Sequence, residues 1–399
     1  QESGNPATGA NPAYSGLTAG PYFFGCSAGS NGTFTGVNFG QRPFAYTAPS
    51  GYKALCTTNL PDPTIADGST AMDVALYTGD GTSDRAITGL SMSPDFVWIK
   101  SRSVARSHIF LDAVRGTDKI LVSDSTLNES DIDSTWLATY GNLDSFDSAG
   151  FTVTDGTNSA GNFNSNNVTY AAWTWDAGAN SSKTYAVTVV SDSGNKYRFD
   201  GFGTSAVTLD LEEGSTYTFD QSDSSNSGHP LRFSTTSNGT HGGGSEYTTG
   251  VVTNGTPGST GAYTKITVAA GAPTLYYYCS VHNGMGGQAN TNSTAGASNF
   301  NGSIISRVRA NPAAGFSIVS VTADASNFGS TVGHGLNAKP EMIIEKRRDA
   351  SSNWYVHHSG LGDMSGSYLR LNTTSAKATD NNWNISEPTS SVISIDPDY

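Results

Sequence analysis

The sequence predicts an all-β protein made of tandem β-sandwich domains. Gly, Ser, Thr and Asn take the place of charged residues, which make up only 14% of the 399-residue chain, against about 25% in an average soluble protein. A polar, Gly-rich chain with many Thr, Val and Tyr favours short strands joined by turns. No stretch shows sustained apolar spacing of helical period. Hydrophobic residues (36%) still suffice for packed cores, so we do not expect a disordered chain.

The charge balance excludes two classes of partner. A net charge of −13 argues against nucleic acid and against insertion into anionic membranes, because both bind basic surfaces. No run reaches the roughly 18 apolar residues of a membrane span, and no signal peptide is present. The chain does not begin with Met, and residue 1 falls in what we take for the middle of a domain. We therefore expect a piece of a longer polypeptide.

The three cysteines are too few for a disulfide framework. Cys26 and Cys56 both lie in the first sixty residues, and they either pair or remain as two buried thiols. Cys279 stands alone in the second half of the chain.

The first predicted domain occupies residues 1–65. It ends in "NLPDPTIADGS", where two prolines break any strand. Upstream, "NFGQRPFAY" and "PSGYKAL" resemble the closing part of a SPRY-type β-sandwich, as seen in phage fibre proteins. The alternative is an unrelated β module.

A long internal repeat follows. Residues 89–116 align with residues 335–362 without a gap, and "DKILVSDST" (118–126) parallels "SYLRLNTTS" (367–375). Upstream, "VALYTGDG" parallels "IVSVTADA". We therefore predict a duplicated domain, with copy 1 at residues 66–178 and copy 2 at 299–399. Copy 2 has no equivalent of "VTYAAWTWDAG" (168–178), so we expect it to be truncated.

Each copy alternates apolar and polar residues in the pattern of a sandwich strand. In "FVWIK" and "MIIEK" the terminal Lys100 and Lys346 are expected to face solvent. Nothing in this pattern is catalytic.

A central domain, predicted at residues 179–298, is inserted between the copies. The joints at 176–183 and 289–303 are small and polar, which predicts linkers. Between them, "YAVTVV", "KYRFDG", "TYTFDQ", "HPLRFS", "YTKITV" and "TLYYYC" are predicted strands of alternating character.

The central domain carries a candidate metal site. His229 follows a polar loop and precedes Pro230, and "CSVHNGMGG" places Cys279, His282 and Met285 three residues apart. Two imidazoles and a thiolate with a weak axial thioether form the ligand set of copper electron-transfer sites. The glycines around Met285 permit a tight turn.

These residues resemble the cupredoxin fold, the type 1 copper β-sandwich, over about 105 residues. The resemblance implies a Greek-key sandwich that binds copper through His229, Cys279, His282 and Met285. The short C-x-x-H-x-x-M spacing is similar to that of amicyanin-like members.

Several alternatives stay open for this site. Cys279 could be a buried thiol, His282 a loop residue and Met285 a core residue with no metal at all. Zinc also binds Cys and His. A particle assembled in a reducing cytoplasm would carry the site empty or with Cu(I). His241, on a Gly-rich loop, is expected at the surface and not as a ligand.

The whole arrangement resembles tail-fibre or other virion structural proteins of marine bacteriophages. That resemblance implies a virion protein outside the host cell that assembles with itself, as a homotrimer, and with neighbouring virion proteins. It also implies display of β-domains to a host surface receptor, such as a glycan. The Tyr, Asn, Ser and Gly content suits a surface that stacks and hydrogen-bonds. No long heptad pattern predicts a coiled coil.

Two other functions compete with this one. The first is a copper-binding electron carrier or an extracellular surface adhesin. The second is a polysaccharide hydrolase, for which paired carboxylates would be needed. The densest acidic positions, Asp131, Asp133, Glu212 and Glu213, are expected in solvated loops.

No other catalytic pattern occurs in the sequence. His357 and His358 are adjacent on a predicted strand, so their rings face opposite sides and do not easily share a metal. No G-x-S-x-G, H-E-x-x-H or P-loop is present. We therefore expect no enzyme activity.

Overall fold

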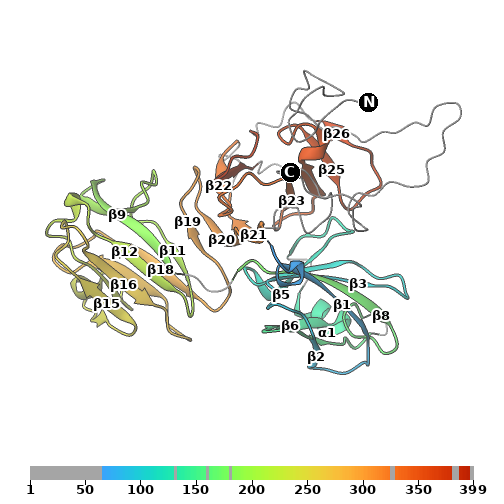
Figure 1. The fold of residues 1–399 in the computed structure, drawn as a ribbon. Helices are drawn as coiled ribbons and strands as arrows, with labels where there is room; N and C mark the ends of the chain where they lie inside the picture. Colours follow the sequence, from blue (N-terminus) through green and yellow to red (C-terminus); the bar gives the residue numbers. More distant parts are fainter. Residues whose placement is uncertain are drawn as a thin grey trace, which may run out of the picture. The chain divides into compact units, whose positions relative to one another are not determined.

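The computed structural model describes residues 65–129, 133–158, 161–178, 182–323, 329–379 and 386–395. The described residues from Asp67 onward belong to one compact unit. The SPRY-like piece predicted at 1–65, with Cys26 and Cys56, lies outside the described residues except for its last position. The prediction of an all-β protein is confirmed, since the described ranges hold many β-strands and a single α-helix (Figure 1). No helix within these ranges is long and apolar enough to cross a membrane.

Copy 1 is built from two antiparallel sheets. The larger has the order β1-β8-β3-β4-β5 and the smaller β2-β7-β6. The short helix α1 (Ser134–Tyr140) is capped at its N-terminus by Asp133, whose side chain accepts a hydrogen bond from the Trp136 amide. The strands of copy 1 are β1 (Met72–Thr78), β2 (Arg85–Thr88), β3 (Phe96–Ser101), β4 (Ile109–Asp112), β5 (Gly116–Val122), β6 (Asn142–Asp147), β7 (Gly150–Thr154) and β8 (Thr169–Trp175).

The central segment forms two five-stranded sheets, with the orders β10-β9-β12-β16-β15 and β11-β18-β17-β13-β14. Each sheet contains one parallel pair, β9 with β12 and β11 with β18, among antiparallel neighbours. The inward faces meet in one core of buried aromatic and aliphatic side chains that also contains Cys279 and Met285. The strands are β9 (Lys183–Ser191), β10 (Asn195–Phe199), β11 (Leu209–Glu212), β12 (Thr216–Asp220), β13 (Leu231–Ser234), β14 (Glu246–Tyr247), β15 (Val251–Asn254), β16 (Tyr263–Thr267), β17 (Leu275–Cys279) and β18 (Gly287–Asn292).

Copy 2 is divided among smaller sheets, with the orders β19-β20-β21, β22-β27 and β23-β24-β25-β26. Its strands are β19 (Ala297–Asn299), β20 (Ser306–Asn311), β21 (Phe316–Val321), β22 (Thr331–Gly333), β23 (Met342–Lys346), β24 (Trp354–His358), β25 (Ser367–Arg370), β26 (Ala378–Thr379) and β27 (Val392–Ser394). Short 3-10 turns complete the described chain: η2 (Gly68–Thr70), η4 (Ser224–Asn226), η5 (Gly239–Gly242) and η7 (Ser359–Leu361).

One hairpin within the gapless part of the predicted repeat has the same strand register in both copies. In copy 1, Phe96 lies opposite Asp112, and the equivalent residues of copy 2, Met342 and His358, lie opposite each other in the same way. The two hairpins therefore share one register along their whole length. This agreement is strong because a slip of one residue would turn every side chain to the other face of the sheet.

The predicted parallel between 118–126 and 367–375 is wrong by one residue. Ile109 lies opposite Val122 in copy 1, whereas its equivalent Tyr355 lies opposite Arg370. The predicted alignment makes Leu371 the equivalent of Val122, and so would have placed Leu371 opposite Tyr355. The reason is a loop before β25 that is one residue shorter than the alignment assumed.

The prediction that the two strand-end lysines face solvent is wrong, since both are half-buried and hydrogen-bonded. Lys100 Nζ donates a hydrogen bond to the carbonyl oxygen of Arg106 at 2.8 Å. Lys346 Nζ donates to the carbonyl oxygen of Ser352, the equivalent position, at 3.0 Å. Each lysine thus closes the loop of its own hairpin, because unpaired carbonyls there need donors.

The second predicted linker, 289–303, is also wrong. Its first residues complete β18, and Ala297–Asn299 form β19. Ala289 and Ser298 are fully buried, and Ser298 Oγ accepts a hydrogen bond from the Asp210 amide at 2.8 Å. Small polar residues suit this segment because it packs closely against β11, not because it is mobile.

A buried ion-pair network joins the three segments. Arg309 in β20 contacts Asp95 of copy 1 (Nε to Oδ1, 2.9 Å) and Glu212 of the central segment (Nη1 to Oε1, 2.6 Å). The three side chains are 13%, 7% and 12% exposed. Glu212 was predicted in a solvated loop, and this is wrong: it ends β11, and its second oxygen accepts a hydrogen bond from the Gly296 amide.

Arg309 is the one cation that both carboxylates of this network share, so the contact between the three segments depends on it. Burial raises the pKa of Asp95 to about 7, although Arg309 and the Ala177 amide lower it. Without the guanidinium, the two carboxylates would keep their hydrogen bonds from the Ala177 and Gly296 amides but lose their shared cation, and a buried charge without its partner is costly.

We predict that Arg309→Ala destabilises the chain by about 3 kcal/mol, because it leaves two buried carboxylates without their cation. The shift of the urea midpoint measures this. The shift should be larger at pH 8 than at pH 5. Asp95, with a pKa of about 7, is neutral at pH 5, and a neutral carboxyl needs no cation beside it. The control is Lys119→Ala, which removes an exposed pair with Asp118 and should cost about 0.5 kcal/mol or less. Equal midpoints for Arg309→Ala and wild type would contradict the prediction.

Candidate metal centre

Strand pairing brings His229 and Cys279 to the same end of one sheet. β13 and β17 are antiparallel, with Leu231, the first residue of β13, opposite Cys279, the last residue of β17. The Ser280 amide then donates a hydrogen bond to the carbonyl oxygen of Pro230 at 3.1 Å. This bond continues the hydrogen-bond ladder beyond the pair Leu231–Cys279, so His229 and Cys279 are held side by side.

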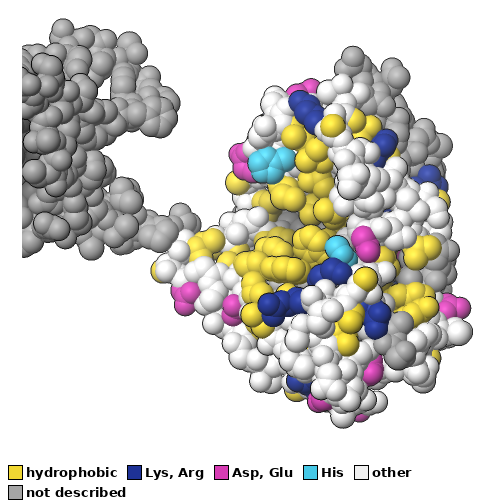
Figure 2. All heavy atoms as spheres, turned by 90° about the vertical axis from the view of Figure 1, so that its right-hand side faces the viewer, with side chains coloured by type: hydrophobic (Ala, Val, Ile, Leu, Met, Phe, Trp, Pro, Cys, Tyr) yellow, Lys and Arg dark blue, Asp and Glu magenta, His cyan; other side chains and the backbone are white. Residues whose placement is uncertain are grey.

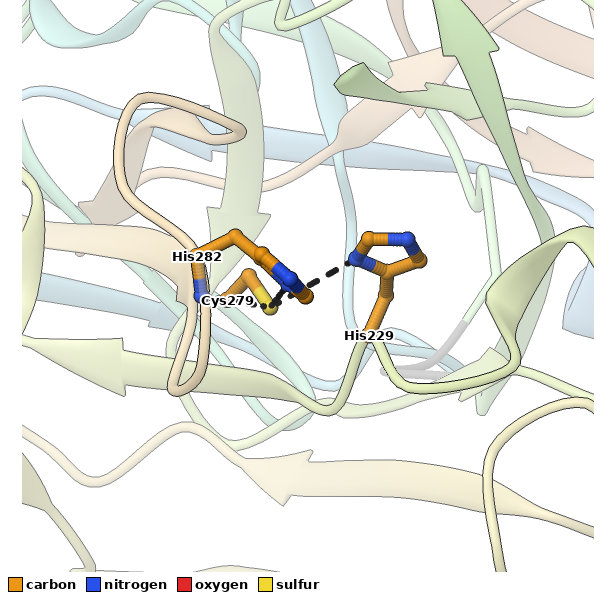
Figure 3. Close-up of side chains that lie close together, drawn as sticks. All are labelled: His229, Cys279 and His282. Atoms are coloured by element: carbon orange, nitrogen blue, oxygen red, sulfur yellow. Dashed lines mark hydrogen bonds between the residues drawn. The ribbon is translucent and has the colours of Figure 1, made fainter.

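The thiol and two imidazoles converge at this point (Figure 3). Cys279 Sγ lies 3.9 Å from Nδ1 of His229 and 3.7 Å from Nδ1 of His282. The candidate ligand atoms of all three residues lie within 4.8 Å of one another. The two imidazole ring centroids are 4.5 Å apart. The structure therefore brings together three of the four predicted ligands at ligand-to-ligand distances.

Met285, the fourth predicted ligand, lies in the core that contains Cys279 and is 1% exposed. Cys279 itself is fully buried, His229 is half-buried and His282 is exposed. The two sulfur residues are therefore shielded from solvent, whereas His282 is exposed to it.

Neutral hydrogen bonds orient His229. Its carbonyl oxygen accepts bonds from Tyr197 Oη and Gln221 Nε2, both at 2.8 Å. Its amide donates to the carbonyl oxygen of Asn226 at 2.8 Å. Asn195 Nδ2 lies 3.4 Å from Nε2 of the ring. Contacts of this kind, made by the ring nitrogen that does not face the metal, are typical of metal-binding histidines.

The loop that carries the other candidate ligands is tightly constrained. The Gly284 amide donates to Asn238 Oδ1 at 2.8 Å, and Lys196 Nζ donates to the Gly284 carbonyl oxygen. A Cβ atom at Gly286 would lie 1.7 Å from the carbonyl oxygen of Tyr277, so only glycine fits there. This close approach turns the chain back into β18.

Tyr197 connects the two ligand-bearing segments. Its amide donates to the carbonyl oxygen of Met285 at 3.0 Å, and its hydroxyl donates to that of His229. One β10 residue therefore holds the backbone of both segments in place.

The electrostatics of the cluster favour a neutral His229. Burial, and then the nearby His282, lower the pKa of His229. A neutral imidazole keeps a lone pair for a metal, whereas a protonated one has none. The candidate cluster of His229, Cys279 and His282 contains no carboxylate.

The distances suit a bound transition metal. With metal–sulfur bonds of about 2.3 Å and metal–nitrogen bonds of about 2.0–2.1 Å, sulfur and nitrogen ligands lie about 3.6–3.8 Å apart. The separation of 3.7 Å to His282 falls within this range, and the separation of 3.9 Å to His229 lies just above it. Cysteine and histidine are also the residue types that copper and zinc prefer. The residues present therefore fit such a metal.

His241 is exposed, as the sequence predicts, and it is not part of the cluster. It still touches the site indirectly, since its Nε2 lies 3.1 Å from the carbonyl oxygen of Cys279. Sequence reasoning missed Asn195, Tyr197, Gln221 and Asn238, which support the ligands. No local signal marks them, because each reaches the site only through the tertiary fold.

The other residues considered as sites lie apart. His357 is buried and His358 exposed on β24, so the prediction that their rings face opposite sides is confirmed. Asp133 caps α1, and Asp131 lies outside the described residues.

A family model described as "Domain of unknown function (DUF7483)" matches residues 67–219 and 289–398. The unmatched residues between the two segments contain His229, Cys279, His282 and Met285, so the match carries no information about the cluster. No curated protein and no solved structure matches this sequence.

We predict that Gly286→Ala opens the cluster, because the added Cβ atom collides with the β17 backbone. The labelling rate of Cys279 by a thiol reagent, followed by mass spectrometry of its peptide, should rise about tenfold or more as the thiol loses its burial. Gly203→Ala is the control, since a Cβ there has no neighbour within 4 Å. An unchanged rate in Gly286→Ala would refute this account of the loop.

Proposed function

We propose that this chain, which belongs to the DUF7483 family, binds one copper ion in its central β-sandwich. The ligands are the thiolate of Cys279 and the Nδ1 atoms of His229 and His282, with Met285 as a weak axial ligand. The observation that supports this most directly is the convergence of one sulfur and two imidazole nitrogens at 3.7 and 3.9 Å.

Copper is favoured over zinc by the donor set. Structural zinc sites are almost always four-coordinate, with Cys, His or carboxylate ligands. The cluster found here supplies three such residues, and the remaining sulfur residue of the loop is a thioether. Two imidazoles, one thiolate and a long thioether contact form the copper electron-transfer arrangement. This assignment agrees with the resemblance to the cupredoxin fold.

The positions of the ligands suggest one-electron exchange as the chemistry that copper supplies here. Cys279 and Met285 are enclosed by the core, which keeps water from the sulfur side. His282 is exposed, so its ring edge is the route by which a partner reaches the site. The hydrogen bonds from Tyr197 and Gln221 keep the His229 backbone in place whether or not a metal is bound.

We predict that Cu(II) binds with a stoichiometry of one and produces an intense thiolate-to-copper absorption at about 600 nm. Cys279→Ser should abolish this absorption, because the thiolate is its origin. His241→Gln should retain it, since that ring contacts the Cys279 carbonyl oxygen and the Tyr278 ring and is not part of the ligand cluster. Copper-titrated protein without this absorption would exclude a type 1 site. Equal metal affinity in wild type and Cys279→Ser would exclude metal binding at this cluster.

A second candidate function is that of a structural and adhesive virion protein, the role implied by the resemblance to marine phage fibres. The observation that favours it is the repetition of one hairpin, with one register and one lysine contact, in two modules of the same chain. Repeated β-modules are typical of proteins that extend and display surfaces. In this role the copper site would serve the stability of one module.

We predict for this second function that the chain sediments at three times its monomer mass and binds host cells saturably. A monomer that binds no host surface would refute it, whatever the outcome of the copper titration. The hydrolase alternative predicts shortened host glycans after incubation, and intact glycans would exclude it.

A further inference from the structure

A cavity of about 580 Å³ is bounded by residues of copy 1, the central segment and copy 2, and it shares no lining residue with the candidate metal centre. Cavities of this size hold small organic molecules. Its charged lining residues are four cations and two carboxylates: Arg115, Lys119, Arg307, Arg348, Glu129 and Asp210. In a chain of net charge −13, a cavity lined by more cations than carboxylates is a local exception.

This gathering of cations differs from the rest of the visible surface. On the face drawn in Figure 2, Lys and Arg side chains are scattered among polar and apolar ones, and Asp and Glu side chains lie among them. Scattered charges of both signs keep a protein soluble without marking a site. Cations that line one concave space instead raise the local concentration of anions.

Arg307 is a half-buried cation that forms no ion pair with any residue that the structure describes. Its Nη2 donates hydrogen bonds to the carbonyl oxygens of Thr294 at 2.7 Å and Ala295 at 2.8 Å, and its Nε donates to that of Gly296 at 3.4 Å. These acceptors are neutral, so they orient the guanidinium group and leave its charge without a direct counter-ion. Burial lowers the pKa of Arg307, although nearby carboxylates such as that of Asp210 act against this.

The other cations of the cavity differ in how far they are already neutralised. Arg115 is paired with Asp112, whose Oδ2 lies 2.6 Å from its Nε. Arg348 shares Glu129 with Arg115, at distances of 3.2 and 3.4 Å from the carboxylate oxygens. The side chain of Lys119 is 49% exposed, and its ammonium group lies 3.5 Å from one exposed carboxylate. Lys119, Arg307 and Arg348 therefore retain charge that a ligand can use.

Both carboxylates of the cavity are engaged by donors. Glu129 lies between two guanidinium groups, and Asp210 Oδ1 accepts hydrogen bonds from the side-chain amides of Asn290 and Asn292, both at 3.1 Å. Hydroxyl-bearing residues line the cavity as well: Thr208, Ser306, Ser320 and Thr322. Such a lining suits a ligand that carries hydroxyl groups as well as charge, because each hydroxyl group both donates and accepts hydrogen bonds.

We propose that this cavity binds a small polyhydroxylated anion, such as a sugar that carries a carboxylate, sulfate or phosphate group. Arg307 and Arg348 supply guanidinium groups, whose donors match the oxygens of such anions. Lys119 adds a more flexible ammonium group. Neither the copper site nor the assembly of the chain enters into this binding.

Isothermal titration of the full chain at low salt tests this with four probes that differ only at carbon 6: glucuronate, glucose 6-sulfate, glucose 6-phosphate and glucose. At least one charged sugar should bind with a stoichiometry of one and a Kd below about 1 mM, and the tightest of the three identifies the preferred anionic group. Glucose should not bind measurably, and inorganic sulfate should bind at least about tenfold more weakly than the best sugar. Kd values above about 1 mM for all three charged sugars would overturn the proposal. So would inorganic sulfate or glucose that binds as tightly as they do.

Two pairs of matched variants locate the binding at this cavity. Arg348→Gln should raise the Kd about tenfold or more, because it removes a charged donor while Glu129 keeps Arg115. Arg347→Gln is its control, since the adjacent Arg347 pairs with Asp349 and does not line the cavity. It should change the Kd about twofold or less.

The second pair separates charge from shape at one exposed position of the cavity wall. Thr208→Glu adds a negative charge and should raise the Kd about fivefold or more, whereas Thr208→Gln, of nearly the same size, should change it about twofold or less. Thr208 is exposed, so both variants should fold. Equal Kd values within either pair of variants would overturn the proposal.

Discussion

The pairing of β13 with β17 is the constraint on which the candidate metal centre depends. Leu231 lies opposite Cys279, and the ladder continues through the bond from the Ser280 amide to the Pro230 carbonyl oxygen. His229 and His282 both lie just beyond this end of the sheet, one on each strand's extension. A register slip of one residue would direct Cys279 away from the core. The contact between sulfur and imidazole therefore follows from backbone pairing before any metal is considered.

The rest of the central sandwich supports this pairing without using charge. Tyr197 and Gln221 hold the His229 backbone, and Gln221 Oε1 also accepts a hydrogen bond from the Leu231 amide at 3.1 Å. One glutamine side chain thus fixes both the ligand segment and the first residue of β13. Because these contacts are neutral and mostly buried, they do not compete for the cation. Such support is what holds a metal site within the narrow tolerance that coordination needs.

The duplicated modules show how one hairpin serves two surroundings. In copy 1 the outer face of the hairpin is covered, as Phe110 packs against Trp354 of copy 2 with ring centroids 4.8 Å apart, and Trp354 Nε1 donates to the Val122 carbonyl oxygen. In copy 2 the corresponding outer face is exposed at Met342 and Ile344. Together with the ion pairs of Arg309, these contacts join copy 1, the central segment and copy 2 into one packed unit.

The sequence by itself determined the all-β class and named the candidate ligands, of which the structure brings three together, because both depend on residue type and short spacing. Alternation specifies strands, and the spacing of three positions from Cys279 to His282 suffices to bring both to one loop. The linker at 289–303, the loop position of Glu212 and the solvent-facing lysines were predicted wrongly. For the linker and for Glu212 a distant partner decided the outcome, β11 and Arg309 respectively, whereas each lysine binds a carbonyl oxygen in the loop of its own hairpin. Only the tertiary structure could place His229 beside Cys279, since fifty residues separate them and the register of β13 on β17 is a property of the folded sheet.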